Sequence, residues 1–472
     1  MLDRVPSLTI DLYELTMAAA YFDNAIEQRG IFELFVRSLP PGRAYLLAAG
    51  LEQALDYLAT LSFSSDQVDH LRAHPSFKHV SGDFFDYLTR FRFTGDVWAV
   101  PEGTAIFGLE PLLRVDAPII EAQVIETFLL STLNFQTLIA SKAARIVTAS
   151  QGRGVVEFGA RRAHGSGAGL LAARAAFIGG CTGTSNVEAG YLFGIPTLGT
   201  LAHSFVMSFD EEDDAFRAFL RVFPDTATIL VDTYDTLAAV RRLALEFGDC
   251  IPAVRLDSGD LIELSRTVRQ ILDDAGMERT RIFASGDLDE HRIAALLEGG
   301  ARIDAFGVGT QLSTSADAPA LGGVYKLVGL VGQGRTSMRI KLSPGKETYP
   351  GAKQVWRLSD ERGRYVEDVI ALADEPPPKA RGSAKALLEQ VMVAGKLVES
   401  QSGPEASASI DSPNQVRERR LARLTQARNT AREELRRLPA ALLHPDSAPD
   451  YRVRISERLE AERDRLDRSL RV

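Results

Sequence analysis

Residues 251–261 read IPAVRLDSGDL, residues 281–287 read RIFASGD, and residues 302–310 read RIDAFGVGT. Each stretch is a short apolar run, typical of a buried strand, that ends in Gly, Ser, Thr or Asp and is followed by a helical pattern. Repeated strand–helix units of this kind build a parallel sheet, because parallel neighbours need a crossover between them. These stretches therefore decide the fold class, which is α/β.

Three stretches further upstream share this pattern, so that six strands are expected in all. They are Gly154–Phe158, Ile195–Thr200 and Thr228–Asp232. Six such units suggest a closed parallel barrel. An open doubly wound sheet has the same alternation, but a dinucleotide-binding domain of that kind carries Gly-x-Gly-x-x-Gly after its first strand, and no such motif stands there. The prediction is an irregular α/β barrel of the TIM type.

The pattern differs before and after the barrel. Residues 1–135 mix helices with short strands, which predicts an N-terminal α+β domain. Residues 136–330 hold the barrel. Residues 331–472 return to sheet and loop and end in charged helices, with a stretch at 399–413 that is rich in Ser, Pro and Ala and is typical of a linker.

Composition narrows the class of protein. The chain has 54 Lys plus Arg against 63 Asp plus Glu, a formal charge of −9, so nucleic acid is not an expected partner. It has 2 cysteines, and its first residues lack the apolar core of a secretory signal, which indicates the reduced cytoplasm. The most apolar long stretch, 124–140, is interrupted by polar residues, so it predicts a buried helix and no membrane partner.

The ends of the predicted strands carry the candidate site, because polar residues at the carboxyl ends of parallel strands face the ligand. Two successive strands end in Ser285-Gly286-Asp287 and in Gly309-Thr310. Glycine lets backbone N–H groups approach a phosphate closely. One such turn alone is more often ordinary turn chemistry, but two in series favour a phosphorylated ligand.

Arg255 and Asp257 lie two residues apart on one strand, so their side chains point the same way. The arginine is suited to an anionic substrate and the aspartate to hydroxyl groups or a divalent cation. The alternative is a structural ion pair, with Asp260 as a helix cap. Arg161 also follows a strand, where adjacent arginines are either a surface feature or a polyphosphate site.

One histidine lies just beyond a predicted strand. His203 follows Ile195–Thr200 and stands between Thr200 and Ser204. A lone histidine is more often structural than catalytic, but this position is one where a nucleophile or a proton carrier would lie. The residues alone thus indicate a cytoplasmic α/β-barrel enzyme that acts on a phosphorylated, anionic substrate.

Taken in order, six segments of the chain resemble the nicotinate phosphoribosyltransferases, which are type II phosphoribosyltransferases. The segments are Thr9–Tyr13, Glu157–Ala163, Gly183–Val187, Gly199–Phe205, Arg255–Leu261 and Gly307–Thr310. No single one is decisive, but the six are in register over nearly the whole chain. The resemblance implies transfer of the phosphoribosyl group from 5-phosphoribosyl pyrophosphate to the ring nitrogen of nicotinate, a step of NAD biosynthesis that gives nicotinate mononucleotide and pyrophosphate.

The resemblance also implies cofactors and an assembly. In the family, ATP is a co-substrate whose hydrolysis is coupled to synthesis through a phosphohistidine, with Mg²⁺ present, and His203 resembles that histidine. Tyr13 resembles the aromatic residue that stacks on the pyridine ring. Since Tyr13 belongs to the N-terminal domain, which in the family closes over the barrel of a second subunit, a homodimer with shared active sites is implied.

The resemblance assigns the remaining roles residue by residue. The catalytic residues are His203, Arg255 and Asp257. Arg255 and Thr200 are similar to the family's nicotinate contacts, and Arg161 is similar to a residue near the substrate and pyrophosphate. The residues that resemble the cradle of the 5-phosphate are Ser285, Gly286, Gly309 and Thr310. Asp257 and Asp287 are the implied partners of ribose or of Mg²⁺.

Three related functions are alternatives. A nicotinamide-using transferase of the same fold carries an acidic residue where alignment gives Ser185, and Ser185 beside Arg255 favours a carboxylate substrate. A quinolinate phosphoribosyltransferase needs no ATP, but its chains are shorter and lack the segment around His203. A non-catalytic, nucleotide-sensing homologue would not need to retain His203, Arg255, Asp257 and Thr310.

Overall fold

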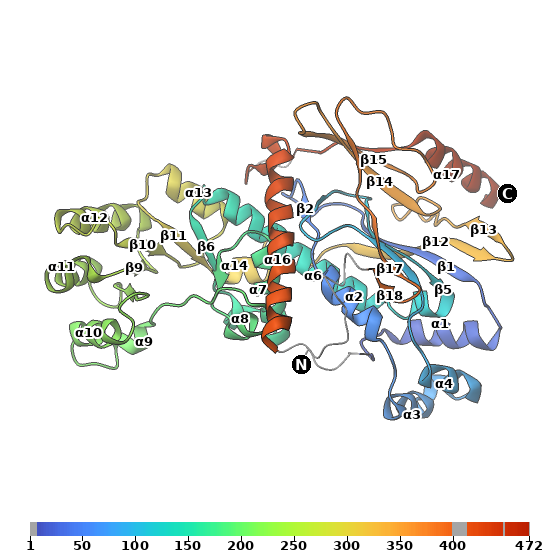
Figure 1. Ribbon diagram of the computed structural model, residues 1–472, viewed down its shortest axis with the longest axis horizontal. Helices are drawn as coiled ribbons and strands as arrows, with labels where there is room; N and C mark the ends of the chain where they lie inside the picture. Colours follow the sequence, from blue (N-terminus) through green and yellow to red (C-terminus); the bar gives the residue numbers. More distant parts are fainter. Residues whose placement is uncertain (1–6, 399–412, 447–448, 472) are drawn as a thin grey trace.

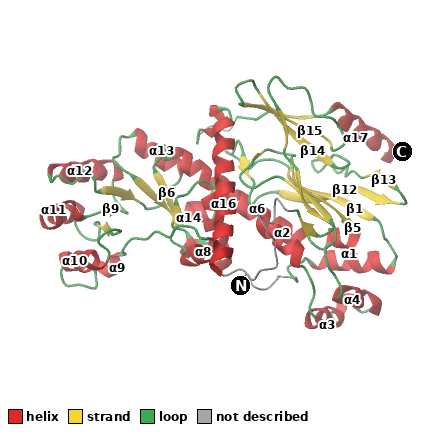
Figure 2. Ribbon diagram, in the orientation of Figure 1, coloured by secondary structure: helices red, strands yellow, loops and turns green. Residues whose placement is uncertain are grey.

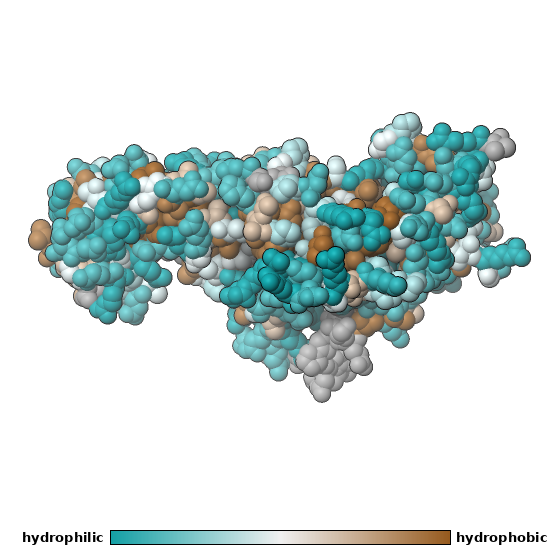
Figure 3. Space-filling model, turned by 90° about the horizontal axis from the view of Figure 1, so that it is seen from above, coloured by the Kyte–Doolittle hydropathy of each residue, from teal (hydrophilic) through white to brown (hydrophobic). Residues whose placement is uncertain are grey.

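The computed structural model describes residues 7–398, 413–446 and 449–471, so the predicted linker lies almost entirely outside the described residues. The molecule has two lobes, one built on a parallel sheet and one on antiparallel sheets, on either side of the long helix α16 (Pro413–Arg437) (Figure 1). Seen from above, its surface is mainly hydrophilic with smaller apolar patches (Figure 3).

The barrel lobe has a six-stranded, all-parallel sheet in the order β7-β6-β11-β10-β9-β8. Its strands are β6 (Gly154–Glu157), β7 (Gly183–Thr184), β8 (Thr228–Leu230), β9 (Ala253–Leu256), β10 (Arg281–Ala284) and β11 (Ala305–Val308). Helices surround these strands (Figure 2). They are α7 (Ser166–Ile178), α8 (Val187–Phe193), α9 (His203–Val206), α10 (Glu212–Val222), α11 (Thr236–Phe247), α12 (Leu261–Asp274), α13 (Glu290–Glu298) and α14 (Thr310–Ser313).

The irregular α/β barrel is confirmed, but the closed ring is corrected. Five of the six predicted strands are present, whereas Ile195–Thr200 makes only one bridge, from Thr197 to Thr184 of β7. Pro196 lacks the N–H group that a ladder needs. Among the described residues β7 and β8 are therefore the edges of an open half-barrel. Strand β7 is not among the six predicted strands.

The second lobe combines strands from distant parts of the chain. Its main sheet has the order β13-β12-β1-β5-β3-β17-β18. The strands are β1 (Arg29–Val36), β3 (Asp96–Ala99), β5 (Pro111–Pro118), β12 (Gly323–Gly332), β13 (Arg335–Met338), β17 (Glu389–Val393) and β18 (Lys396–Leu397). Strand β1 pairs antiparallel with both β5 and β12, so segments before and after the barrel share one sheet.

Smaller sheets and helices complete this lobe. The strands are β14 (Lys353–Ser359), β15 (Tyr365–Leu372), β16 (Ala384–Ala386) and β19 (Val453–Ile455) in one sheet, and β2 (Leu46–Leu47) with β4 (Ala105–Ile106) in another. The helices are α1 (Leu12–Asp23), α2 (Leu51–Thr60), α3 (Ser65–Ala73), α4 (Gly82–Thr89), α5 (Ile119–Gln123), α6 (Glu126–Ala149) and α17 (Glu457–Leu470). Short 3₁₀ turns occur in both lobes: η1 (Pro75–Phe77), η4 (Ala440–Leu443) and, between elements of the barrel lobe, η2 (Ala160–Arg162) and η3 (Gly248–Cys250).

Helix α6 joins the two hydrophobic cores. Leu129 and Leu133 in its first half pack in the core of the antiparallel lobe, and Ala143 and Ile146 in its second half pack in the barrel core. The run 119–149 is long and apolar enough to cross a membrane by length and composition, but 67% of its apolar window is buried inside the fold. It is a core helix, as the interrupted apolar pattern predicts.

Candidate active site

Arg255 and Asp257 form a closed hydrogen-bonded ring with Ser285 at the carboxyl ends of β9 and β10. Arg255 donates from Nε to Ser285 Oγ over 2.8 Å and from Nη2 to Asp257 Oδ1 over 2.8 Å, while the Ser285 hydroxyl donates to the same Oδ1. Nη1 donates to Thr200 Oγ1 over 2.6 Å. The ring locks the guanidinium in one orientation.

The surroundings of Asp257 favour its ionised form. Burial alone raises the pKa of Asp257, but the Ser285 hydrogen bond and the Arg255 charge outweigh it, and the pKa lies below its ordinary value. The Arg255 guanidinium also lies over the Phe158 ring, 5.9 Å from its centroid. Among the described residues, three of its five N–H groups donate hydrogen bonds, which leaves one on Nη1 and one on Nη2.

His203 lies beside this ring, at the start of α9. Its Nδ1 is 3.1 Å from Thr233 Oγ1, and its Nε2 is 3.9 Å from Asp232 Oδ1 and 4.0 Å from Asp257 Oδ2. Its side chain is 43% exposed, so solvent and ligands reach the imidazole. The Asp232 and Asp257 carboxylates face Nε2, and the Thr233 hydroxyl faces Nδ1.

Asp232 is a site residue that the sequence analysis did not select. It follows β8, its side chain is 3% exposed, and its Oδ2 accepts hydrogen bonds from Asp257 N and Ser258 Oγ. Its buried Oδ1 has no hydrogen-bond partner and faces His203. The signal was available, because Asp232 is a carboxylate at the end of a predicted strand.

The two glycine turns lie on neighbouring strands, β10 and β11. Gly286 has φ +99°, and a Cβ there would lie 2.2 Å from Asp257 O. Asp287 follows with φ +48° and is exposed. A Cβ at Gly309 would lie 3.3 Å from Phe158 O, and exposed Thr310 begins α14. The close approach of backbone to backbone explains why glycine stands at both turns.

Replacing Gly286 tests this close approach. Alanine at a positive φ is destabilising by itself. Beyond that cost, we expect Gly286→Ala to lower the free energy of unfolding by a further amount of about 1–3 kcal/mol, because the methyl group displaces the turn that carries Asp257. The measurement is urea denaturation. The matched control is Gly276→Ala, which has φ +74° and no atom within 4 Å of the added Cβ. Equal losses in both variants would contradict the contact.

Arg161 and Ser185 lie at the ends of β6 and β7. Both are exposed, and Ser185 N donates to Glu157 O over 2.9 Å. Glu157 is a second buried carboxylate that sequence analysis missed, and it accepts from Thr184 Oγ1 and Gly159 N. Burial raises its pKa, and those two hydrogen bonds oppose the rise. It organises the loop that carries Arg161.

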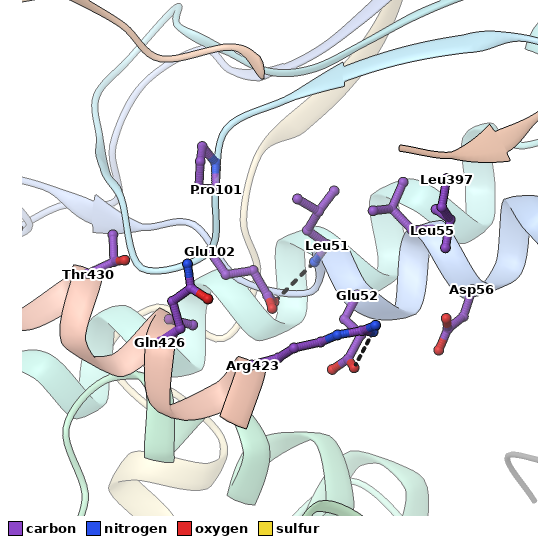
Figure 4. Close-up of a pocket in the computed structure, with 11 residues that line it drawn as sticks. Leu51, Glu52, Leu55, Asp56, Pro101, Glu102, Leu397, Arg423, Gln426 and Thr430 are labelled. Atoms are coloured by element: carbon purple, nitrogen blue, oxygen red, sulfur yellow. Dashed lines mark hydrogen bonds and ion pairs between the residues drawn. The ribbon is translucent and has the colours of Figure 1, made fainter. Parts of the chain in front are cut away.

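Tyr13 is the one predicted site residue that lies in the other lobe. It belongs to α1, on the opposite side of α16 from the strand ends, and is 45% exposed (Figure 1). A pocket of about 130 Å³ also lies away from the strand ends, between α2, the Pro101–Glu102 turn and α16 (Figure 4). None of the predicted site residues lines it.

Fold and site together define the class: an α/β half-barrel whose strand ends bring a guanidinium and carboxylates beside an exposed imidazole. Family models agree with this class over most of the chain. They are the nicotinate phosphoribosyltransferase N-terminal domain at residues 8–134, the nicotinate phosphoribosyltransferase family at 154–332 and its C-terminal domain at 352–462. The chain belongs to the nicotinate phosphoribosyltransferase family and is an enzyme of that kind.

Individual relatives agree. The chain is 46% identical to nicotinate phosphoribosyltransferase pncB2 of Mycobacterium tuberculosis, over 98% of this chain and 94% of that one. It is 46% identical to nicotinate phosphoribosyltransferase of Bacillus subtilis, over 78% and 76%. The crystal structure of human nicotinic acid phosphoribosyltransferase matches with a TM-score of 0.82 at 29% identity, covering 97% of this chain and 99% of that one.

Proposed function

We propose that this enzyme makes nicotinate mononucleotide and pyrophosphate from nicotinate and 5-phosphoribosyl pyrophosphate, coupled to ATP hydrolysis through a phosphohistidine at His203. The observation that carries the proposal is the ring of Arg255, Ser285 and Asp257 with His203 beside it. It joins a cation for the substrate carboxylate, an anion for the sugar and a nucleophile in one place.

Nicotinate binding rests on Arg255. The fork left on Nη1 and Nη2 matches the two oxygens of a carboxylate, and the guanidinium is already fixed by Thr200, Ser285 and Asp257. Because the side chain is only 12% exposed, its attraction for an anion is weakly screened by water. Ser185 adds no charge that would repel the carboxylate.

The coupled step begins at His203 Nδ1. Its lone pair forms the N–P bond to the γ-phosphorus of ATP while the bond between that phosphorus and the β–γ bridging oxygen breaks, and ADP leaves with the electron pair. Hydrolysis later forms a P–O bond to water and breaks the N–P bond, whose electron pair returns to Nδ1; the neutral imidazole is regenerated, phosphate is released and the proton from water passes to solvent. Asp232 and Asp257 stabilise the imidazolium charge that develops on Nε2.

The ribosyl transfer needs no general base. The pyridine nitrogen forms the bond to C1 of the ribose, the C1–oxygen bond breaks, and pyrophosphate leaves with the electron pair. Positive charge builds on the sugar in the transition state, and Asp257 is the carboxylate placed to stabilise it. The Gly286 and Gly309 turns, with Thr310, suit the 5-phosphate, and Arg161 suits the pyrophosphate.

Mg²⁺ fits this site as a cation shared with phosphate. In the parts of the chain that the structure describes, no group of three or more His, Cys, Asp and Glu side chains is arranged to hold a metal. Asp257 Oδ2 and exposed Asp287 would supply one or two carboxylate oxygens, which is what Mg²⁺ takes from a protein when phosphates and water complete its shell. When bound, Mg²⁺ neutralises charge on the leaving pyrophosphate.

A homodimer would bring Tyr13 to the site. Tyr13 and Leu12 are each 45% exposed on α1, while Val187 (75%), Met207 (64%) and Tyr234 (66%) are exposed on segments that follow the strand ends. If the exposed residues of α1 in one copy contacted the exposed residues after the strand ends in a second copy, Tyr13 would stack over the strand-end site of the partner subunit. Cys181 and Cys250 are free, which suits a cytoplasmic enzyme.

The test supplies nicotinate, 5-phosphoribosyl pyrophosphate and Mg²⁺ with γ-³²P-labelled ATP. We expect nicotinate mononucleotide by mass spectrometry and an acid-labile, base-stable phosphate on the protein. We expect His203→Ala to lose that label, because it removes the imidazole beside the ring of Arg255, Ser285 and Asp257. We expect it to retain slower, ATP-independent synthesis.

The matched control is His164→Ala, since His164 is exposed on the loop after η2. It should keep the label and the ATP-stimulated rate. A label that persists in His203→Ala would reject the phosphohistidine role, and failure of the wild-type enzyme to form the mononucleotide would reject the proposed reaction.

A further inference from the structure

A carboxylate of one helix caps the N-terminus of another beneath Tyr13. Glu14 of α1 is fully buried, and its Oε1 accepts hydrogen bonds from Thr127 N over 3.1 Å and from Thr127 Oγ1. Thr127 is the second residue of α6, so its N–H is one of the donors that a helix start leaves without an intrahelical partner. The two residues are 113 positions apart in the chain.

The cap is needed because α6 does not supply its own. The residue at its N-cap position is Ile125, whose side chain has no oxygen to accept from the N–H groups of the first turn. A negative charge at that end also interacts favourably with the dipole of this 24-residue helix. Glu14 therefore does for α6 what a serine or aspartate usually does from within the helix itself.

The same contact fixes the start of α1. Asp11 is the N-cap of α1 and makes no side-chain cap, but its backbone N donates to Thr127 Oγ1 over 3.3 Å. Thr127 thus holds the residues on both sides of the first turn, Asp11 and Glu14. Tyr13 lies between them, and burial together with the carboxylate of Glu126, the first residue of α6, raises the pKa of its hydroxyl. The direction of the Tyr13 ring depends on this joint.

We propose that Glu14 is a positioning residue, which anchors the first turn of α1 on the N-terminus of α6 and thereby sets the direction of the Tyr13 ring. The inference rests on the proposed function, in which Tyr13 stacks on nicotinate in the partner subunit's pocket. Glu14 does not touch substrate. It acts on nicotinate binding through Tyr13 and leaves phosphoribosyl binding and the chemistry at His203 to other residues.

The surroundings of Glu14 raise the pKa of its carboxyl group, so its ionisation can be followed by changing the pH. Glu14 Oε2 and the Tyr57 hydroxyl are both buried without a hydrogen-bond partner in the described structure. Burial and the charges of Glu126 and Asp11 raise the pKa of Glu14 to about 7, although the hydrogen bonds from Thr127 lower it. The groups facing it from other elements are Glu126 on α6, which Lys326 of β12 approaches, and the hydroxyls of Tyr57 on α2 and Tyr325 on β12.

The experiment compares Glu14→Ala and Glu14→Gln with the wild type in the full chain. The glutamine amide oxygen still accepts from Thr127, so Glu14→Gln is the rescue variant. We expect Glu14→Ala to speed amide hydrogen exchange about 10-fold in the peptides spanning 8–20 and 124–132. We also expect it to raise KM for nicotinate about 10-fold, which is the scale of a lost helix cap. KM for 5-phosphoribosyl pyrophosphate and labelling of His203 by ATP should stay within about 2-fold, as expected of a contact made only through Tyr13.

Glu14→Gln should keep wild-type exchange and KM. It should also gain thermal stability relative to the wild type as the pH rises from about 5 to about 8, because a carboxyl with a raised pKa loses stability as it ionises in the folded state. Unchanged exchange in Glu14→Ala would overturn the cap. Equal increases in KM for both substrates, or no rescue by glutamine, would reduce Glu14 to a structural residue.

Failure of the proposed function gives a different result. If the wild type does not turn over nicotinate while Glu14→Ala still speeds exchange at both peptides, the cap holds and the link to nicotinate is overturned. If the wild type is active and neither exchange nor KM changes in Glu14→Ala, the inference alone is overturned.

Discussion

Arg255→Ala should weaken nicotinate binding about 100-fold and leave nicotinamide binding within about 5-fold, because it removes a charge-assisted pair of hydrogen bonds that only the carboxylate makes. The effect is large since Arg255 is 12% exposed and held by Ser285, Thr200 and Asp257, so little reorganisation accompanies binding. Isothermal titration of each ligand to the full enzyme with 5-phosphoribosyl pyrophosphate measures both affinities.

Arg255→Lys separates charge from geometry. Lysine keeps the positive charge but has no planar fork, and it cannot donate to Ser285, Thr200 and Asp257 at once. We expect it to recover nicotinate affinity only partly. Arg162→Ala, which removes a nearby exposed arginine of η2, should leave both affinities unchanged. Equal losses for nicotinate and nicotinamide in Arg255→Ala would reject the role.

Polar residues at the carboxyl ends of parallel strands face the ligand, and this rule explains why much of this site could be predicted. Arg255 and Asp257 lie on the same side of one strand, and Ser285 ends the next, so a parallel sheet must bring them together whatever its curvature. The hydrogen bonds within the ring follow from that neighbourhood. Gly286 and Gly309 were likewise predictable, because glycine at a strand end permits a close backbone approach, and a Cβ at Gly286 would lie 2.2 Å from Asp257 O.

Pairings between distant segments could not be predicted. Strand β12 lies beside β1 because their apolar faces cover the same core, and nothing local to either segment specifies the partner. The 195–200 segment has strand-like composition, but Pro196 and the demands of the Thr200 contact to Arg255 prevent a ladder. Tertiary context overrides local propensity at both places.

Asp232 could have been selected from the sequence, whereas the role of Glu14 could not. Asp232 ends a predicted strand, and the rule that selected Asp257 applies to it equally. Glu14 lies in the middle of a motif that resembles the family, but its role depends on Ile125 being unable to cap α6. Only a structure that shows α1 against α6 reveals that the missing cap comes from elsewhere.

Arg174→Met should lower the free energy of unfolding by about 3–5 kcal/mol, the usual result of removing one partner from a buried charge network. Arg174 of α7 is fully buried and donates to Glu102, Glu52 and Gln136. These partners come from the Pro101–Glu102 turn, α2 and α6, so one guanidinium joins the barrel lobe to the other lobe. Glu102 and Glu52 also line the pocket of Figure 4. Thermal and urea denaturation measure the loss.

The pH dependence of that loss identifies its cause. Burial raises the pKa of Glu102, but Arg174 and two backbone N–H groups outweigh it, so in the wild type the pKa lies below its ordinary value. The stabilisation from such a carboxylate is present above its ordinary pKa and is lost as the pH falls through the lowered one. The deficit of Arg174→Met should therefore be largest near neutral pH and shrink in acid.

Two comparisons isolate the unpaired charge from the lost packing. Arg72→Ala removes a surface arginine 3.7 Å from Asp86 and should change stability by less than about 1 kcal/mol. Adding Glu102→Gln to Arg174→Met should restore part of the stability, because the neutral amide can be buried without a counter-charge. A double variant less stable than Arg174→Met would mean that packing, and not the stranded carboxylate, holds the lobes together.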